Sequence, residues 1–103
     1  PYSIETDASD GQIGFVFQQA DEDDVHHPLG YCSRQLNAAE VNYSATEKEA
    51  LAIFWAVTHL RPYLERSHFA VRTDHSSLLW LLNISGDNYR LVSRRLRLAE
   101  FSF

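Results

Sequence analysis

The sequence predicts a single α/β domain, a sandwich in which helices cross a mixed β-sheet. Two extended apolar runs near the start of the chain flank a strong turn signal, which is typical of a β-hairpin. A long apolar helical run comes next, and another strand-like run comes after it. A helix that connects strands in this way packs across the sheet that the strands form. The 103 residues, of which 45% are hydrophobic, are enough for one small core.

The first part of the sheet is expected from three extended runs, at Tyr2–Thr6, Ile13–Gln18 and Pro28–Arg34. Asp10-Gly11 marks the turn of the first hairpin, because this dipeptide favours the tight turns between antiparallel strands. Gly14 permits close packing or a bulge. The segment 19–27 is polar and acidic, so we expect an exposed loop. It lacks the alternating ligands and central glycine of a calcium loop.

The strongest helix is expected from Ala45 to about Leu60. Its residues 50–57 are apolar without a break, which indicates a helix buried on most of its surface. Arg61-Pro62 marks its end, because the residue before a proline disfavours the helical conformation.

The rest of the chain predicts four shorter elements. They are a strand at Ser67–Thr73, a short helix at Ser76–Leu82, a basic amphipathic helix at Tyr89–Ala99 and an extended run at Glu100–Phe103. The complete order is therefore three strands, a helix, a strand, two helices and a final strand.

Charge and cysteine content limit the classes of function. The net charge of −5 argues against nucleic-acid binding by the whole surface, but four of the negative charges lie in one loop. Arginines gather in the last third of the chain, so a local basic face remains possible. The single cysteine, Cys32, excludes an internal disulfide and a cysteine-based zinc cluster. The sequence contains no signal-peptide pattern and no apolar run of membrane-spanning length.

Three carboxylates stand at the ends of different predicted elements: Asp7, Glu49 and Asp74. The two aspartates follow strand-like runs, and the glutamate opens the long helix. A helix-covered sheet would gather all three at one edge. Carboxylates gathered in this way repel each other unless a cation lies between them. Oxygen ligands favour magnesium or manganese over zinc, so the pattern indicates metal-dependent phosphoryl-transfer chemistry.

Each of these residues also has a simpler interpretation. Asp7 can be an ordinary turn residue. Glu49 can complete a capping box with Thr46, as Glu47 can with Ser44, so either glutamate is a candidate for the site. The small residues on the same helical stripe favour Glu49.

The motifs TDxS, YCSRxL, NYSxTEKE and TDHxxLxWLL, in this order and spacing, resemble the ribonuclease H domain of gypsy-type LTR retrotransposon reverse transcriptases. The resemblance spans essentially all 103 residues. It implies an RNase H-like fold and a metal-dependent endonuclease that cleaves the RNA strand of RNA–DNA hybrids with two divalent ions.

Residue by residue, the resemblance makes Asp7, Glu49 and Asp74 the catalytic and metal-binding residues, for Mg²⁺ or Mn²⁺. The basic helix face formed by Arg94, Arg95 and Arg97 is expected either to follow the hybrid phosphates or to be simply solvated. The implied partners are the RNA–DNA hybrid and a polymerase domain of the same polyprotein, with no membrane. The implied location is the cytoplasm, the nucleus or a virus-like particle, not the secreted fraction.

The family also carries a further aspartate in a C-terminal helix, within an ADALSR-like segment. This chain stops at Phe103, before such a segment, so it is expected to be a fragment of one RNase H-like domain that lacks the end of the last strand and the C-terminal helix. The alternative function is a non-catalytic connection-like or domesticated binding module with the same fold.

Overall fold

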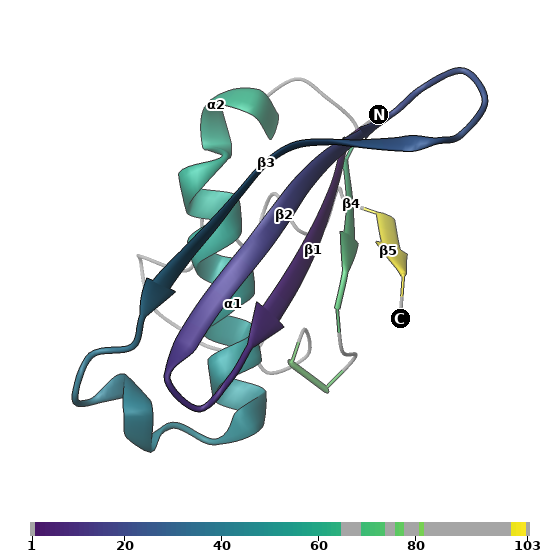
Figure 1. Cartoon of the computed structure of the whole chain (residues 1–103). Coiled ribbons are helices and arrows are strands. Elements are labelled where there is room, and N and C mark those ends of the chain that lie inside the picture. The colour runs from purple at the N-terminus through teal and green to yellow at the C-terminus, as the bar shows by residue number, and fades with distance from the viewer. Residues whose placement is uncertain (1, 65–68, 74–75, 78–80, 82–99, 103) are drawn as a thin grey trace.

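The computed structural model describes residues 2–64, 69–73, 76–77, 81 and 100–102. A five-stranded sheet carries the two labelled α-helices on one face (Figure 1). The elements, in chain order, are β1 (Tyr2–Ala8), β2 (Gln12–Ala20), β3 (His26–Gln35), the 3₁₀ helix η1 (Glu40–Asn42), α1 (Ala45–His59), α2 (Arg61–Leu64), β4 (Phe69–Arg72) and β5 (Glu100–Ser102).

The sheet is mixed, as the sequence predicted. Its strand order is β3-β2-β1-β4-β5. The first three strands form an antiparallel meander, whereas β4 lies parallel to β1 and β5 lies parallel to β4. Helix α1 packs against β1 and β2 and connects the antiparallel part of the sheet to the parallel part. The predicted α/β sandwich with crossing helices is therefore confirmed.

The first three strands agree with the predicted runs and extend them by one or two residues at most ends. Gly14 serves close packing, because a Cβ at this position would lie 3.1 Å from the carbonyl oxygen of Cys32 on β3. The irregularity in the β2–β3 pairing lies elsewhere, between Phe17 and Gln18.

Helix α1 begins where the capping signal predicted. The Ser44 hydroxyl accepts a hydrogen bond from the Glu47 backbone N–H, and the Glu47 carboxylate accepts one from the Ser44 N–H, both at 3.1 Å. The first of the two possible capping boxes is thus formed, which engages Glu47 in the cap.

The end of α1 differs from the prediction in one respect. Arg61-Pro62 does end the long helix, but a second short helix, α2, starts at once. Pro62 lies in the first turn of α2, where a proline loses no helical hydrogen bond. The sequence signal for the end of the long helix was right, whereas α2 itself was not predicted.

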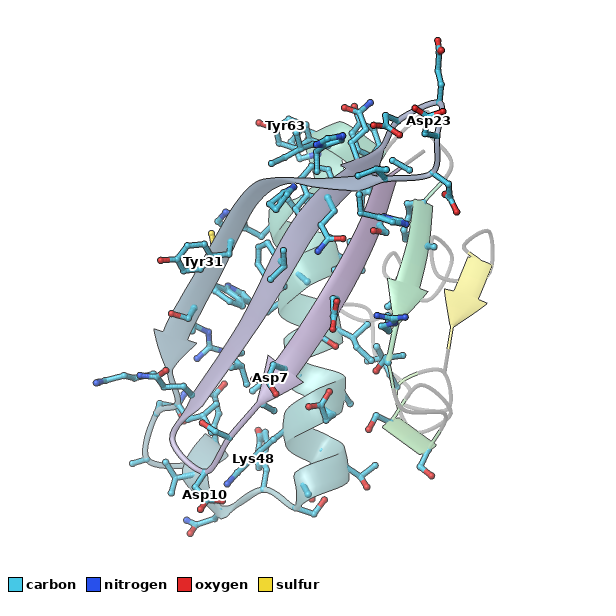
Figure 2. The ribbon with its side chains drawn as sticks, turned by 45° about the vertical axis from the view of Figure 1, so that its right-hand side comes forward. Asp7, Asp10, Asp23, Tyr31, Lys48 and Tyr63 are labelled. Carbon is cyan, nitrogen blue, oxygen red and sulfur yellow. The ribbon has the colours of Figure 1, made fainter. Side chains whose placement is uncertain are left out.

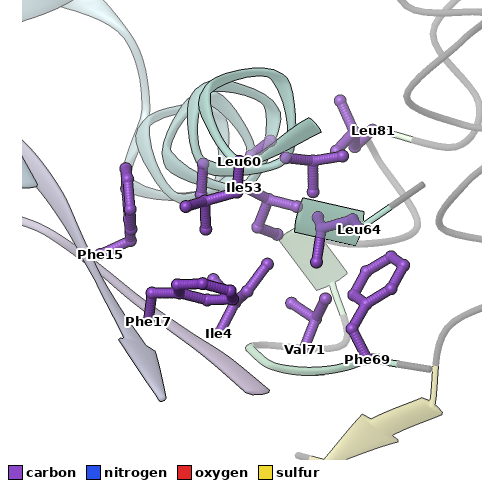
Figure 3. Close-up of a cluster of buried hydrophobic side chains, with 12 residues drawn as sticks. Ile4, Phe15, Phe17, Ile53, Leu60, Leu64, Phe69, Val71 and Leu81 are labelled. Carbon is purple, nitrogen blue, oxygen red and sulfur yellow. The ribbon is translucent and has the colours of Figure 1, made fainter. Parts of the chain in front are cut away.

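The core lies between the sheet and α1 (Figure 3). Aromatic and branched side chains from the strands meet the helical face in one cluster that includes Ile4, Phe15, Phe17, Ile53, Val57, Leu60, Leu64, Phe69, Val71 and Leu81. A smaller cluster of Ile13, Leu36 and Ala52 extends the core to the end of the sheet where α1 begins. Each fully buried large side chain contributes roughly 1.5–3 kcal/mol.

The last third of the chain is described only in part. The predicted strand Ser67–Thr73 appears as β4, and the extended run after residue 99 appears as β5. Of the predicted helix Ser76–Leu82, residues 76, 77 and 81 are described and are helical. The predicted helix Tyr89–Ala99 lies outside the described residues. None of the helices that the structure describes is long and apolar enough to cross a membrane.

Candidate metal site at the carboxyl end of β1

Asp7 is the second-last residue of β1, at the end of the strand that leads into the β1–β2 turn. Along β1 the side chains alternate, so Ile4 is buried toward α1 while Asp7 is exposed. Across the sheet its neighbour is Gly14, which has no side chain to cover it. Among the described residues, none forms a hydrogen bond or an ion pair with the Asp7 carboxylate. Within the described part of the chain, this acidic group is therefore exposed and holds no other segment in place.

Glu49 lies in the second turn of α1 and is half-buried. Its neighbour Lys48 fixes where this turn sits, because the Lys48 ammonium donates a hydrogen bond to the Asp10 carbonyl oxygen at 3.1 Å. Asp10 belongs to the turn that follows Asp7. Figure 2 shows Asp7, Asp10 and Lys48 at the same end of the molecule. The fold thus brings the elements that carry Asp7 and Glu49 to one end of the sheet.

Asp74 lies outside the described residues, but the strand that precedes it is well placed. The last described pair between the parallel strands β1 and β4 is Glu5 with Arg72. Asp7 follows Glu5 by two residues and Asp74 follows Arg72 by two residues. Because β1 and β4 are parallel, their carboxyl ends lie at the same end of the sheet. Within the described part of the chain, no group of three or more His, Cys, Asp or Glu residues is positioned to hold a metal ion.

The donor chemistry at this end fits a hard cation. Asp7 and Glu49 offer carboxylate oxygens, which suit magnesium or manganese.

The predicted phosphate-contacting residues Arg94, Arg95 and Arg97 also lie outside the described residues, so their placement stays a prediction.

The β1–β2 turn is held from several sides. The Ser9 N–H donates to the Gln12 carbonyl at 2.8 Å, and the Gln12 N–H donates to the Ser9 hydroxyl at 3.2 Å. The Leu36 N–H donates to the Gly11 carbonyl at 2.9 Å. Together with the Lys48 contact, these bonds fix the backbone that follows Asp7. The sequence patterns assigned no role to Lys48, although it is the only lysine of the chain and directly precedes Glu49.

A structural ion pair lies at the same end, beyond β3. Arg34 donates two hydrogen bonds to the Glu40 carboxylate, at 2.9 and 3.0 Å, and its guanidinium lies 5.6 Å from the ring centre of Trp55. Glu40 also accepts from the Asn37 N–H at 2.9 Å. The hydrogen bonds from Arg34 hold the pKa of the buried Glu40 below its ordinary value. This pair anchors η1, and no sequence pattern predicted it.

The β2–β3 loop at the opposite end is exposed, as predicted. The Asp21 carboxylate accepts hydrogen bonds from the N–H groups of Asp23 and Val25, each at 2.9 Å, and lies 2.7 Å from His27 Nε2. The bond with His27, followed by the backbone N–H of Val25, lowers the pKa of Asp21. Asp24 adopts a positive φ of 59°, as short polar residues do in tight loops. The acidic cluster therefore shapes its own loop.

The sequence is similar to a known domain family and to polyproteins of transposons. Residues 1–101 match the family described as the RNase H-like domain found in reverse transcriptase. The chain is 41% identical over 102 residues to the retrovirus-related Pol polyprotein from transposon 297 of Drosophila melanogaster, covering 99% of this chain and 9% of the relative. It is 39% identical over 104 residues to the transposon Tf2-3 polyprotein of Schizosaccharomyces pombe, covering 97% and 8%. The chain thus spans less than a tenth of the length of these relatives.

Solved structures share the fold at low sequence identity. The foamy viral protease–reverse transcriptase dRH in complex with double-stranded DNA matches with a TM-score of 0.70 and 14% identity, covering 99% of this chain and 20% of that one. The PFV RNase H domain in solution matches with a TM-score of 0.56 and 14% identity, covering 98% and 75%. This chain belongs to the RNase H-like domains found in reverse transcriptases, and its relatives are retrotransposon Pol polyproteins, as its motifs predicted.

Proposed function

We propose that this domain is a metal-dependent endonuclease that hydrolyses the RNA strand of RNA–DNA hybrids as part of a retrotransposon reverse transcriptase. One observation carries the proposal. The contact of Lys48 with the β1–β2 turn brings the start of α1, with Glu49, to the end of the sheet where Asp7 is exposed. Strand β4, which leads to Asp74, runs parallel to β1 toward the same edge. Asp7 and the start of α1, with Glu49, therefore lie at one end of the sheet, and β4 ends at that same end two residues before Asp74 in the sequence.

In this proposal Asp7, Glu49 and Asp74 hold Mg²⁺ or Mn²⁺. Such ions, when bound there, would supply the activation of a water molecule and the stabilisation of the leaving 3′ oxygen. The chain's own residues supply the ligands and their orientation. Asp7 projects from a strand whose turn is fixed, and Glu49 projects from a helix whose start is capped and docked. A rigid arrangement of this kind favours ligand geometry, since magnesium requires nearly ideal octahedral positions.

The proposed substrate is inferred from the family and from the proteins of similar fold. One of these, the foamy viral protease–reverse transcriptase, has been solved in complex with an RNA/DNA hybrid. For this chain we propose the same class of ligand, with Arg94, Arg95 and Arg97 as phosphate contacts. Such contacts recognise the backbone and the shape of the hybrid, with 2′-hydroxyls distinguishing the RNA strand. The polymerase domain of the same polyprotein is the proposed partner.

The test is hybrid cleavage by this chain and by a polypeptide that continues beyond Phe103, each in Mg²⁺ and in Mn²⁺. Glu49→Gln keeps the size of the side chain and removes its charge. We expect at least a roughly 100-fold loss of cleavage, because loss of a direct ligand exceeds the loss caused by residues that only support one. Asp21→Asn, the same kind of change in the β2–β3 loop, is the control and should leave cleavage unchanged. Equal cleavage by Glu49→Gln and wild type in the longer polypeptide would overturn the proposal.

A further inference from the structure

Lys48 is a charged residue of α1 that neither the proposed chemistry nor the helix cap uses. It is only 8% exposed, and its ammonium donates to the Asp10 carbonyl oxygen, a contact between residues 38 positions apart in the chain. It lies between Glu47, which belongs to the helix cap, and Glu49. The chain has no other lysine.

A lysine at this position is costly for stability. Burying an ammonium removes it from water, and one carbonyl oxygen replaces only part of its hydration. The start of a helix carries the positive end of the helix dipole, which repels a cation. An unbranched apolar side chain that is one atom shorter, such as methionine, fills similar space without either penalty. Packing alone therefore does not account for a lysine here.

The contact does account for one geometric relation. Asp10 follows Asp7 by three residues in a turn whose other bonds leave it little freedom, including the Leu36–Gly11 hydrogen bond of 2.9 Å. Lys48 precedes Glu49 in a helix whose first turn is capped. The Lys48–Asp10 hydrogen bond thus links α1, which carries Glu49, directly to the turn that follows Asp7.

We propose that Lys48 is a positioning residue of the metal site: its bond to Asp10 sets the placement of Glu49 relative to Asp7. The inference rests on the proposed nuclease function and names the residue that makes the site rigid. Losing the bond should loosen the start of α1 without removing a ligand. A displacement of about 1 Å at a reacting centre costs up to roughly 100-fold in rate.

The single lysine allows a direct measurement on the intact chain. Selective ¹³C labelling of lysine gives one ε-CH₂ signal, that of Lys48. Titration with Mg²⁺ should shift this signal together with the backbone amides of Asp7 and Glu49, and Asp7→Asn should abolish the shift. If the amides respond and the lysine signal does not, the role of Lys48 is wrong while the metal site stands. If none of them responds, the metal site itself is wrong, and the inference fails with it.

Substitutions complete the test in the cleavage assay. Lys48→Met should lower kcat by roughly 10- to 100-fold with little change in KM for the hybrid. Lys48→Arg keeps a donor and should recover most of the rate. Leu64→Val, which trims the core at the far end of the helical layer, is the matched control for lost stability and should leave kcat unchanged. An equal kcat loss in Lys48→Met and Leu64→Val, or no recovery in Lys48→Arg, would refute the positioning role.

Discussion

The β2–β3 loop and the β1–β2 turn lie at opposite ends of β2, and they use their acidic side chains in opposite ways. In the loop, the Asp21 carboxylate accepts two backbone N–H bonds and pairs with His27, so it holds its own segment together. At the turn, the backbone is held by other groups, namely Lys48 and Leu36. The Asp7 carboxylate beside it has no partner among the described residues.

The difference indicates that the number of acidic residues in a segment does not tell which carboxylates the described fold leaves available for a cation. The loop carries four acidic residues in a row, yet the carboxylate of the first, Asp21, already has hydrogen-bond partners in the protein. At the turn, support comes from the backbone and from a lysine, which leaves the carboxylate available. A carboxylate that serves no structural purpose can bind a cation without the loss of any internal bond.

The largest expected effect concerns the ion pair that holds the corner next to the turn. Glu40→Gln removes the charge that Arg34 contacts twice, and we expect a loss of about 2 kcal/mol in the free energy of unfolding, since hydrogen bonds between charged groups contribute roughly 1.5–3 kcal/mol each. Urea denaturation measures the loss, with Glu22→Gln in the exposed loop as the matched control. Asp7→Asn should cost less than Glu40→Gln. A larger loss of unfolding free energy in Asp7→Asn than in Glu40→Gln would show that Asp7, and not Glu40, is the carboxylate with the structural role.

A smaller effect is expected from the cation. Mg²⁺ or Mn²⁺ that binds only the native state should stabilise it by about 1.4 kcal/mol at ten times its dissociation constant. For a domain of this size that corresponds to a rise in Tm of roughly 5–10 °C. Asp7→Asn should reduce the rise, and Asp21→Asn should not. A rise lost in Asp21→Asn but kept in Asp7→Asn would move the cation to the opposite end of the sheet.

The smallest effect is the pH dependence of the loop. Folding lowers the pKa of Asp21 below its ordinary value of 3.8, mainly through the bond with His27, so the folded state favours the ionised carboxylate. This contribution is complete above the unfolded-state pKa and is lost as the pH falls through the folded-state pKa. The stability difference between wild type and Asp21→Asn should therefore shrink as the pH falls below about pH 4. A difference that persists undiminished at about pH 2.5, well below the ordinary aspartate pKa, would show that the carboxylate charge is not what holds the loop.

The local patterns of the sequence predicted most of the fold. The Asp10-Gly11 turn, the extended runs of the first three strands and the apolar run of α1 each depend on neighbouring residues only, and each is confirmed. The Ser44–Glu47 cap was predicted for the same reason. Helix α2 was missed because Pro62 ends one helix and also fits the first turn of the next.

The candidate site was predicted less completely. The types of residue and their strand-end positions pointed to Asp7, Glu49 and Asp74, but no local pattern reports a contact such as that between Lys48 and Asp10, whose partners meet only in the folded chain. The Arg34–Glu40 pair was missed because a bend between β3 and η1 brings the two charges together. The positions of Asp74 and of the three arginines remain predictions.

The alternation along β1 has a consequence for folding errors. Ile4 packs in the core and Asp7 is exposed, and both are fixed by the same pairing with β2, in which Ile4 faces Phe17 and Asp7 faces Gly14. A slip of one residue in this pairing would turn every side chain of the strand to the other face, so Asp7 would enter the core as Ile4 left it. The penalty for burying that charge removes the misaligned chain from the folded population. A chain in which Ile4 is buried therefore also has the Asp7 carboxylate on the exposed face of β1. The requirement for a packed core thus also selects the orientation that the proposed active site needs.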